Sequence, residues 1–155
     1  MSNENVSKAR ERFVGVWTLE SFTERSDADE RSAPLGEEPL GFLIYTADGF
    51  VSAQLMRAER EPFQADPWEA GAPIDAVDLR KDYIAYCGRY EINEKSSEVI
   101  HMPLVALLPN LIHQEQHRSF TFEEDTLTLV TSRGRLNGSV VTSTLLWRRC
   151  PIEMV

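Results

Sequence analysis

Cysteine is scarce in this sequence of 155 residues, which contains only Cys87 and Cys150. Two cysteines are too few for a disulfide scaffold, and their spacing matches no metal motif, so we interpret both as buried or edge thiols. Basic residues are also few: 16 Lys and Arg against 25 Asp and Glu give a net charge of −9. That charge argues against binding to nucleic acid or to an anionic membrane.

Long apolar segments and familiar catalytic motifs are missing as well. The N-terminal stretch MSNENVSKARERF lacks the apolar core of a signal peptide, and no later segment is long enough to span a bilayer. We therefore expect a cytoplasmic protein that does not enter a membrane. No Ser-His-Asp motif, phosphate-binding glycine loop or dinucleotide fingerprint is present, which disfavours the familiar hydrolases, kinases and nicotinamide enzymes, and we expect no cofactor.

Short segments with the alternation of β-strands make up most of the chain. They predict about eight strands separated by turns at hairpin distances, which is typical of an antiparallel β-barrel or sandwich. Helical spacing predicts short helices over 5–13 and 75–84. The length favours a single domain over 1–155, with its core within 13–149.

The segment Gly41–Arg57, GFLIYTADGFVSAQLMR, is the clearest hairpin. Asp48-Gly49 between two strand-like runs predicts a two-residue type I′ turn, which places Tyr45 opposite Ser52. In that register one face mixes polar and apolar side chains, as the lining of a small-molecule cavity does. Its residues are Leu43, Tyr45, Ser52, Gln54 and Met56. The other face is wholly apolar: Phe42, Ile44, Val51, Ala53 and Leu55.

The segment 58–73 has three prolines and no strand period, so it predicts a long irregular loop. Phe63 and Trp68 in this loop need an apolar surface. We hold two interpretations open: the loop closes the mouth of a barrel as a gate, or the two aromatic side chains pack on its outer wall.

Several segments together resemble the bacterial and fungal lipocalin-like domain family. Gly15-Val16-Trp17 resembles the G-x-W start of lipocalins, and Leu146-Trp147-Arg148-Arg149 resembles their closing strand. The segments between them that carry the resemblance are GFLIYTADGFVSAQLMR, IAYCGRYEI, VIHMPLVALLPN and EQHRSFTF. The resemblance implies an eight-stranded, calycin-like β-barrel in which an arginine near the chain end packs over the first-strand tryptophan. It does not specify the function.

Strand alternation predicts polar side chains inside this barrel. His101 is expected to face inward with Val99, Val105 and Leu107, and Phe120 and Phe122 to face it with Gln116 and Arg118. We interpret His101 either as a core histidine bonded to a neighbouring hydroxyl or as a catalytic group. Buried arginine is costly unless it is paired, so Arg118 requires a buried carboxylate, a ligand oxygen or water at the barrel mouth. Two interpretations stay open: Arg118 orients a ligand, or it is paired structurally with a Tyr or Glu side chain. The predicted ligand-binding residues are Tyr45, Gln54, Met56, Trp68, Tyr86, Tyr90, His101, Gln116, Arg118 and Phe120.

A metal site is not expected. His113 and His117 would lie about 13 Å apart along a strand, too far to share an ion. Apolar residues also fall on the predicted outer wall, including Ile100, Met102 and Leu104, and a covered outer patch predicts a homodimer.

Three functions remain open at this point. The first is binding of a small, mostly apolar molecule that carries a carbonyl, carboxyl or hydroxyl group. The second is a cofactor-free cyclase, isomerase or dehydratase, in which His101 would act as acid and base and Arg118 or Tyr86 would polarise a carbonyl. The third is a structural dimerisation module with a filled interior.

Overall fold

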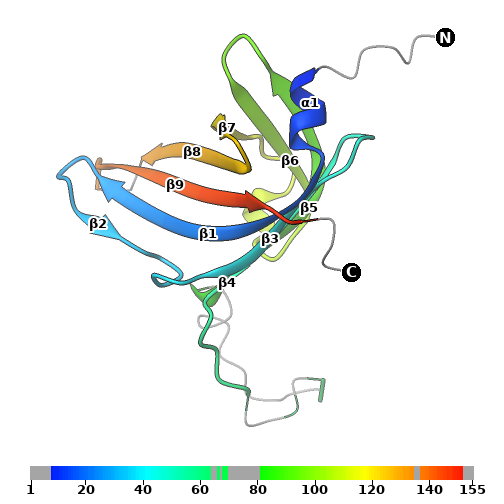
Figure 1. The fold of residues 1–155 in the computed structure, drawn as a ribbon. Coiled ribbons are helices and arrows are strands. Elements are labelled where there is room, and N and C mark those ends of the chain that lie inside the picture. Colours follow the sequence, from blue (N-terminus) through cyan, green and yellow to red (C-terminus); the bar gives the residue numbers. More distant parts are fainter. Residues whose placement is uncertain (1–7, 64–65, 67, 70–80, 135–136, 152–155) are drawn as a thin grey trace.

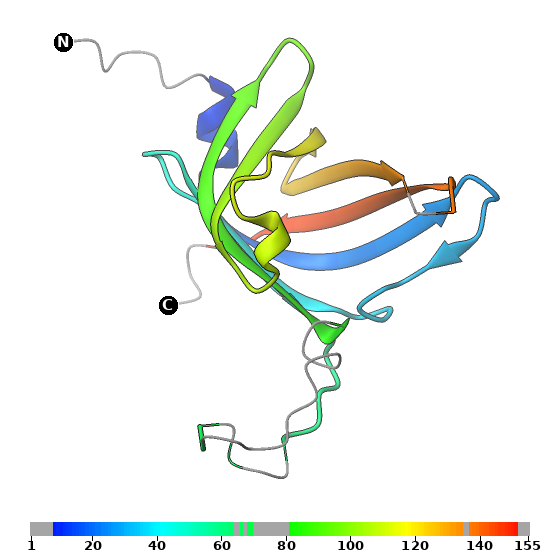
Figure 2. The ribbon, with the colours of Figure 1, turned by 180° about the vertical axis from the view of Figure 1, so that it is seen from behind.

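Eight strands close into an antiparallel barrel in the computed structural model, which describes residues 8–63, 66, 68–69, 81–134 and 137–151. The strands are β1 (Gly15–Ser26), β3 (Leu40–Tyr45), β4 (Phe50–Met56), β5 (Tyr83–Asn93), β6 (Glu98–Ala106), β7 (Gln116–Glu123), β8 (Thr126–Gly134) and β9 (Val140–Arg149). They follow one another around the barrel, β9 pairs back with β1, and the two-residue β2 (Arg31–Ser32) extends β1 (Figures 1 and 2). The predicted fold class is confirmed.

Among the described residues the strands are accompanied by α1 (Lys8–Phe13) and the 3-10 turn η1 (Pro109–Leu111), and Lys81 and Asp82 are also helical. The helix predicted over 5–13 is confirmed from residue 8 onward, and its first residues lie outside the described ranges. The helix predicted over 75–84 lies mostly outside them too, but Tyr83 and Ile84 belong to β5, so its predicted end was wrong. Within the described residues, no helix has the length and apolar character needed to cross a bilayer.

Phe13, at the end of α1, covers one end of the barrel. Its ring makes T-shaped contacts with Tyr45, Phe120 and Phe122, at centroid distances of 5.1, 4.9 and 4.8 Å. The indole nitrogen of Trp17 donates a hydrogen bond of 2.8 Å to the Phe13 carbonyl oxygen, which ties the helix to β1. This end of the barrel is therefore closed by aromatic packing.

Arg149 seals the same end from β9. Its guanidinium carbon lies 4.2 Å from the centre of the Trp17 ring, and its Nη1 donates to the Val14 carbonyl at 2.9 Å. The arginine packing implied by the family resemblance is thus present. Gly15 has a φ of 130°, and a side chain there would meet Arg149 Nη1 at 2.9 Å, so this crossing requires glycine.

The β3–β4 hairpin differs from its prediction by one residue. Gly49 has a φ of 93°, whereas Asp48 does not have the positive φ that a type I′ turn requires. The Gly49 N–H donates to the Thr46 carbonyl at 3.2 Å, and Thr46 pairs with Phe50 across a three-residue loop. Tyr45 therefore lies opposite Val51 rather than Ser52.

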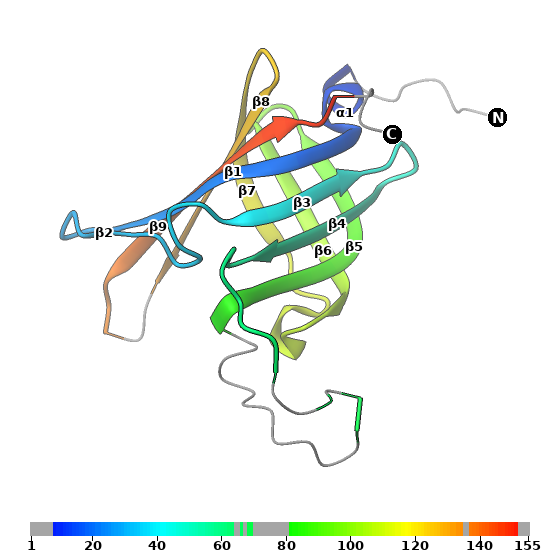
Figure 3. The same cartoon turned by 60° about the horizontal axis from the view of Figure 1, so that its bottom comes forward.

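The shift exchanges the faces of β4, because side chains alternate along a strand. Val51, Ala53 and Leu55 are buried inside the barrel, so their predicted outer position was wrong. Gln54 and Met56 lie on the outer face, so their predicted place in the lumen beside Tyr45 was wrong as well. Figure 3 shows the wall that β1, β3, β4 and β5 form side by side.

A β-bulge changes the faces of β6 in a similar way. The register shifts between Cys87 and Gly88, so that Gly88 pairs with Pro103 and Cys87 with Val105. A side chain at Gly88 would lie 1.9 Å from the Met102 carbonyl oxygen, a distance that only glycine avoids. Pro103 still faces inward with His101, but beyond it the faces are exchanged and Val105 is 62% exposed. The predicted inward position of Val105 and Leu107 was wrong.

Candidate functional site

The buried imidazole of His101 connects two tyrosines inside the barrel. Its Nε2 lies 2.7 Å from the Tyr45 hydroxyl oxygen, and its Nδ1 lies 2.7 Å from that of Tyr86. His101 lies on β6, Tyr45 on β3 and Tyr86 on β5, so three strands contribute to this hydrogen-bonded chain. The predicted inward orientation of all three is confirmed, and both nitrogens of the histidine are occupied.

Burial determines the protonation state of the hydrogen-bonded side chains Tyr45, His101 and Tyr86. It holds the pKa of His101 well below its ordinary value, and the positive charge of Arg118 lowers it further. Burial raises the pKa of Tyr86 and raises that of Tyr45 well above the ordinary range, and Arg118 opposes both shifts. Imidazolium and phenolate are thus both disfavoured, and the three hydrogen-bonded side chains Tyr45, His101 and Tyr86 are all neutral around pH 7.

Arg118 lies on the inner wall next to the chain. Its guanidinium carbon is 5.9 Å from the centre of the Tyr86 ring, and the side chain is half-buried. Its Nη1 donates to the Gln116 carbonyl oxygen at 3.0 Å. Among the described residues no carboxylate is paired with it. The predicted structural pairing with a tyrosine is thus present in part, through the Tyr86 ring, and a ligand oxygen or water remains for the other N–H groups.

The neighbouring inward residues are mostly apolar. Phe120 and Ile84 are partly buried and pack against the core. Tyr90 packs edge-on against Tyr45 at 4.9 Å and donates its hydroxyl hydrogen to the Thr46 carbonyl at 2.8 Å. Gln116, which precedes Arg118 on the same face, bonds to the Gln114 carbonyl at 3.2 Å. Tyr90, Gln116 and Phe120 therefore all lie on the predicted inner face.

Gln54 and Met56 belong to a different surface. They line an apolar groove of about 500 Å³ on the outer wall, together with Leu40, Phe42 and Tyr83. The Tyr83 hydroxyl donates to Gln54 Oε1 at 2.8 Å. The groove is separated from His101 and Arg118 by the sheet itself, so the structure does not bring these two predicted residues to the rest of the site.

Trp68 is also away from the site. Its side chain is 93% exposed, and that of Phe63 is 42% exposed. Neither of the two predicted arrangements, a gate over the barrel mouth or packing on the outer wall, places an indole that far into solvent. Residues 64–65, 67 and 70–73 of the segment 58–73 lie outside the described residues. Trp68 is therefore not placed among the residues that line the barrel.

A second polar cluster, which strand periodicity did not indicate, surrounds Glu24. Its buried carboxylate accepts hydrogen bonds from Ser143 at 3.0 Å and from Arg133 at 2.9 Å. Glu24 lies near the end of β1, which continues to Ser26, and a bulge between Leu19 and Ser21 turns Phe22 and Glu24 inward. The sequence signal for this inward face is Phe22, an apolar residue two positions before Glu24 on the same strand.

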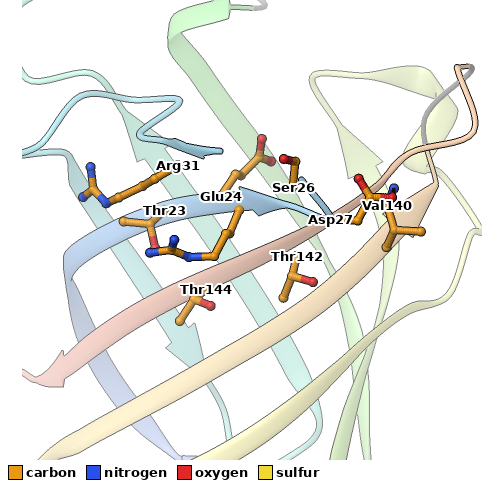
Figure 4. Close-up of a pocket in the computed structure, with 9 residues that line it drawn as sticks. Thr23, Glu24, Ser26, Asp27, Arg31, Val140, Thr142 and Thr144 are labelled. Atoms are coloured by element: carbon orange, nitrogen blue, oxygen red, sulfur yellow. Dashed lines mark hydrogen bonds between the residues drawn. The ribbon is translucent and has the colours of Figure 1, made fainter. Parts of the chain in front are cut away.

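A groove of about 370 Å³ crosses the neighbouring surface, between β2 and the ends of β1 and β9 (Figure 4). Thr23, Thr142 and Thr144 are among its lining residues. Its two arginines are already paired, Arg25 with Asp29 and Arg31 with Glu37, both at 2.8 Å. The groove therefore offers hydroxyl groups but no uncompensated arginine, unlike the inner wall at Arg118.

Comparison with known proteins agrees with the closed barrel and its sealed end. No curated protein matches the chain. The family model of the lipocalin-like domain matches residues 14–150, from the residue before Gly15 to the one after Arg149. That match covers most of the sequence, and the chain belongs to the family of lipocalin-like domains.

Proposed function

We propose that this barrel binds a small, mostly apolar molecule in its lumen and holds an oxygen group of that molecule at Arg118. The observation that carries the proposal is an inward, half-buried guanidinium with no carboxylate partner among the described residues. An unpaired charge on an otherwise apolar wall is costly, and a ligand oxygen reduces that cost. Phe120 and Ile84 supply the apolar surface beside it.

An enzyme is less well supported than a binding protein. Both nitrogens of His101 are bonded to tyrosine hydroxyls, so its imidazole has no free position for a substrate proton. A net proton transfer along the chain would leave a buried phenolate or imidazolium, and the pKa directions of Tyr45 and His101 disfavour both. His101 is better explained as a residue that positions Tyr86.

Native mass spectrometry of the freshly purified protein tests the proposal. We expect a non-covalent adduct of a small organic molecule, and extraction with an organic solvent should remove it. A parallel titration with an apolar ligand should change the emission of the inward Trp17 and Trp147 when the exposed Trp68 is replaced by Phe. Absence of both an adduct and an emission change would contradict binding in the lumen.

A further inference from the structure

The Arg118 guanidinium and the Tyr86 hydroxyl lie on the same inner wall, and both can donate hydrogen bonds. From this we infer that the ligand is a carboxylic acid with an apolar body, and that its carboxylate binds the Arg118 guanidinium and the Tyr86 hydroxyl. The inference rests on the proposed function, since it names the class of molecule that the lumen would take.

The donors of Arg118 are largely unused. A guanidinium has five N–H groups in a fixed planar arrangement, and among the described residues only the bond to the Gln116 carbonyl engages one of them. That geometry matches the two oxygens of a carboxylate, which can bind it through two parallel hydrogen bonds. A carboxylate would also neutralise the charge, which a ketone, an ester or an alcohol cannot do.

Tyr86 can offer a hydroxyl hydrogen to a ligand because it lies at one end of the hydrogen-bonded series Tyr45–His101–Tyr86. A neutral imidazole has one N–H and one acceptor nitrogen, so one tyrosine donates to His101 and the other accepts. The tyrosine that accepts keeps its own hydroxyl hydrogen for another partner. The structure places this free hydrogen at one end of the chain, on either Tyr45 or Tyr86.

Both tyrosines are buried, and among the described residues His101 is the only hydrogen-bond partner of each hydroxyl. Tyr45 is packed under Phe13 and against Tyr90, whereas Tyr86 has the Arg118 guanidinium carbon 5.9 Å from the centre of its ring. A carboxylate held at Arg118 would therefore select one arrangement: Tyr45 donates to Nε2, Nδ1–H donates to the Tyr86 oxygen, and the Tyr86 hydroxyl donates to the ligand.

The donor pair distinguishes three ligands of equal chain length. Decanoate can accept from both groups and neutralise the charge; methyl decanoate can only accept; 1-decanol brings a hydroxyl hydrogen of its own. We expect isothermal titration calorimetry at pH 7 to give a dissociation constant for decanoate at least about tenfold below that of 1-decanol, with the ester between them.

Two variants separate charge from general packing. Arg118→Gln should weaken decanoate binding by at least about tenfold and leave 1-decanol nearly unchanged. Arg89→Gln is the matched control, because it removes the same charge from the outer face, where Arg89 lies over Phe50 at 4.5 Å. Tyr86→Phe should weaken decanoate binding about three- to tenfold while keeping the ring.

The outcomes distinguish this inference from the proposed function. Equal binding of decanoate and 1-decanol, with no selective effect of Arg118→Gln, would overturn the inference that the ligand is a carboxylate. It would leave the proposal of binding in the lumen intact. Phe120→Ala should weaken all three ligands if they enter the lumen, and circular dichroism checks that this variant folds. Binding of none of them, or binding that Phe120→Ala does not affect, would overturn both. Arg118 is half-buried on a strand, so its variant is expected to fold even if that of Tyr86 does not.

Discussion

The buried imidazole of His101 predicts a specific loss of stability in acid. In the unfolded chain a histidine binds a proton near its ordinary pKa of 6.5, whereas burial keeps the folded-state pKa well below that. The unfolded state therefore binds more protons as the pH falls through 6.5, and the free energy of unfolding decreases. Above about pH 7 both states carry a neutral imidazole, and this contribution is constant.

The size of the effect follows from the linkage relation. Each pH unit well below 6.5 costs about 1.4 kcal/mol for one proton bound only by the unfolded chain. Between pH 7 and pH 5 the sum reaches at most about 2 kcal/mol, because titration begins gradually around 6.5. For a domain of this size that corresponds to about 4–8 °C in melting temperature.

Urea denaturation of the wild type and of His101→Gln at pH 7 and pH 5 measures this loss of stability in acid. The glutamine lowers stability at both pH values, but it cannot titrate, so its additional loss between them should be smaller than that of the wild type by about 2 kcal/mol. His117→Gln is the control, since His117 is exposed and lies beside Glu115 at 3.0 Å. An equal pH dependence in His101→Gln and wild type would refute the reasoning.

The remaining predictions concern the barrel and its outer wall. Gly88→Ala should cost at least about 2–3 kcal/mol in urea denaturation, whereas Gly134→Ala, with no atom within 4 Å of the added carbon, should be nearly neutral. Arg149→Met should cost about 1–3 kcal/mol because it removes the contact with Trp17 and hydrogen bonds to two carbonyls; an unchanged denaturation midpoint would contradict this. We also propose that the outer patch around Phe42, which is 52% exposed, joins two copies of the chain; sedimentation should then give a dimer that Phe42→Glu dissociates, and a monomeric wild type would contradict it.

The architecture was accessible from the sequence because it depends on features that repeat along the whole chain. Alternation over β5 placed Tyr86 and Tyr90 inward, and alternation over β7 did the same for Arg118 and Phe120. β5 pairs regularly with β4, and the extra residue of its bulge with β6 lies on β6 rather than on β5. β7 pairs regularly with both of its neighbours, so counting by twos gives the correct face in both strands.

The errors arose where one residue is inserted. A single additional residue in the turn before Phe50 exchanged the two faces of β4, and the bulge at Gly88 did the same beyond Pro103. Such insertions depend on local backbone angles and on contacts with a neighbouring strand, neither of which strand periodicity contains. Gly88 itself is the local signal, since a glycine inside a strand often marks a bulge.

The site was predicted residue by residue but not as an assembly. Alternation indicated that His101, Tyr45 and Tyr86 face inward, yet it could not show that both imidazole nitrogens would be occupied. That arrangement depends on the relative stagger of β3, β5 and β6, which is a tertiary property. Of the two roles predicted for His101, the structure agrees with the core histidine bonded to a neighbouring hydroxyl rather than with the catalytic acid and base.

A crystal structure of the protein grown with decanoate tests the central claim most directly. The account predicts electron density for the acid inside the barrel, with a carboxylate oxygen within hydrogen-bond distance, about 3 Å, of both the Arg118 guanidinium and the Tyr86 hydroxyl. Density only in the outer groove between Leu40 and Met56, with an empty inner wall at Arg118, would contradict it.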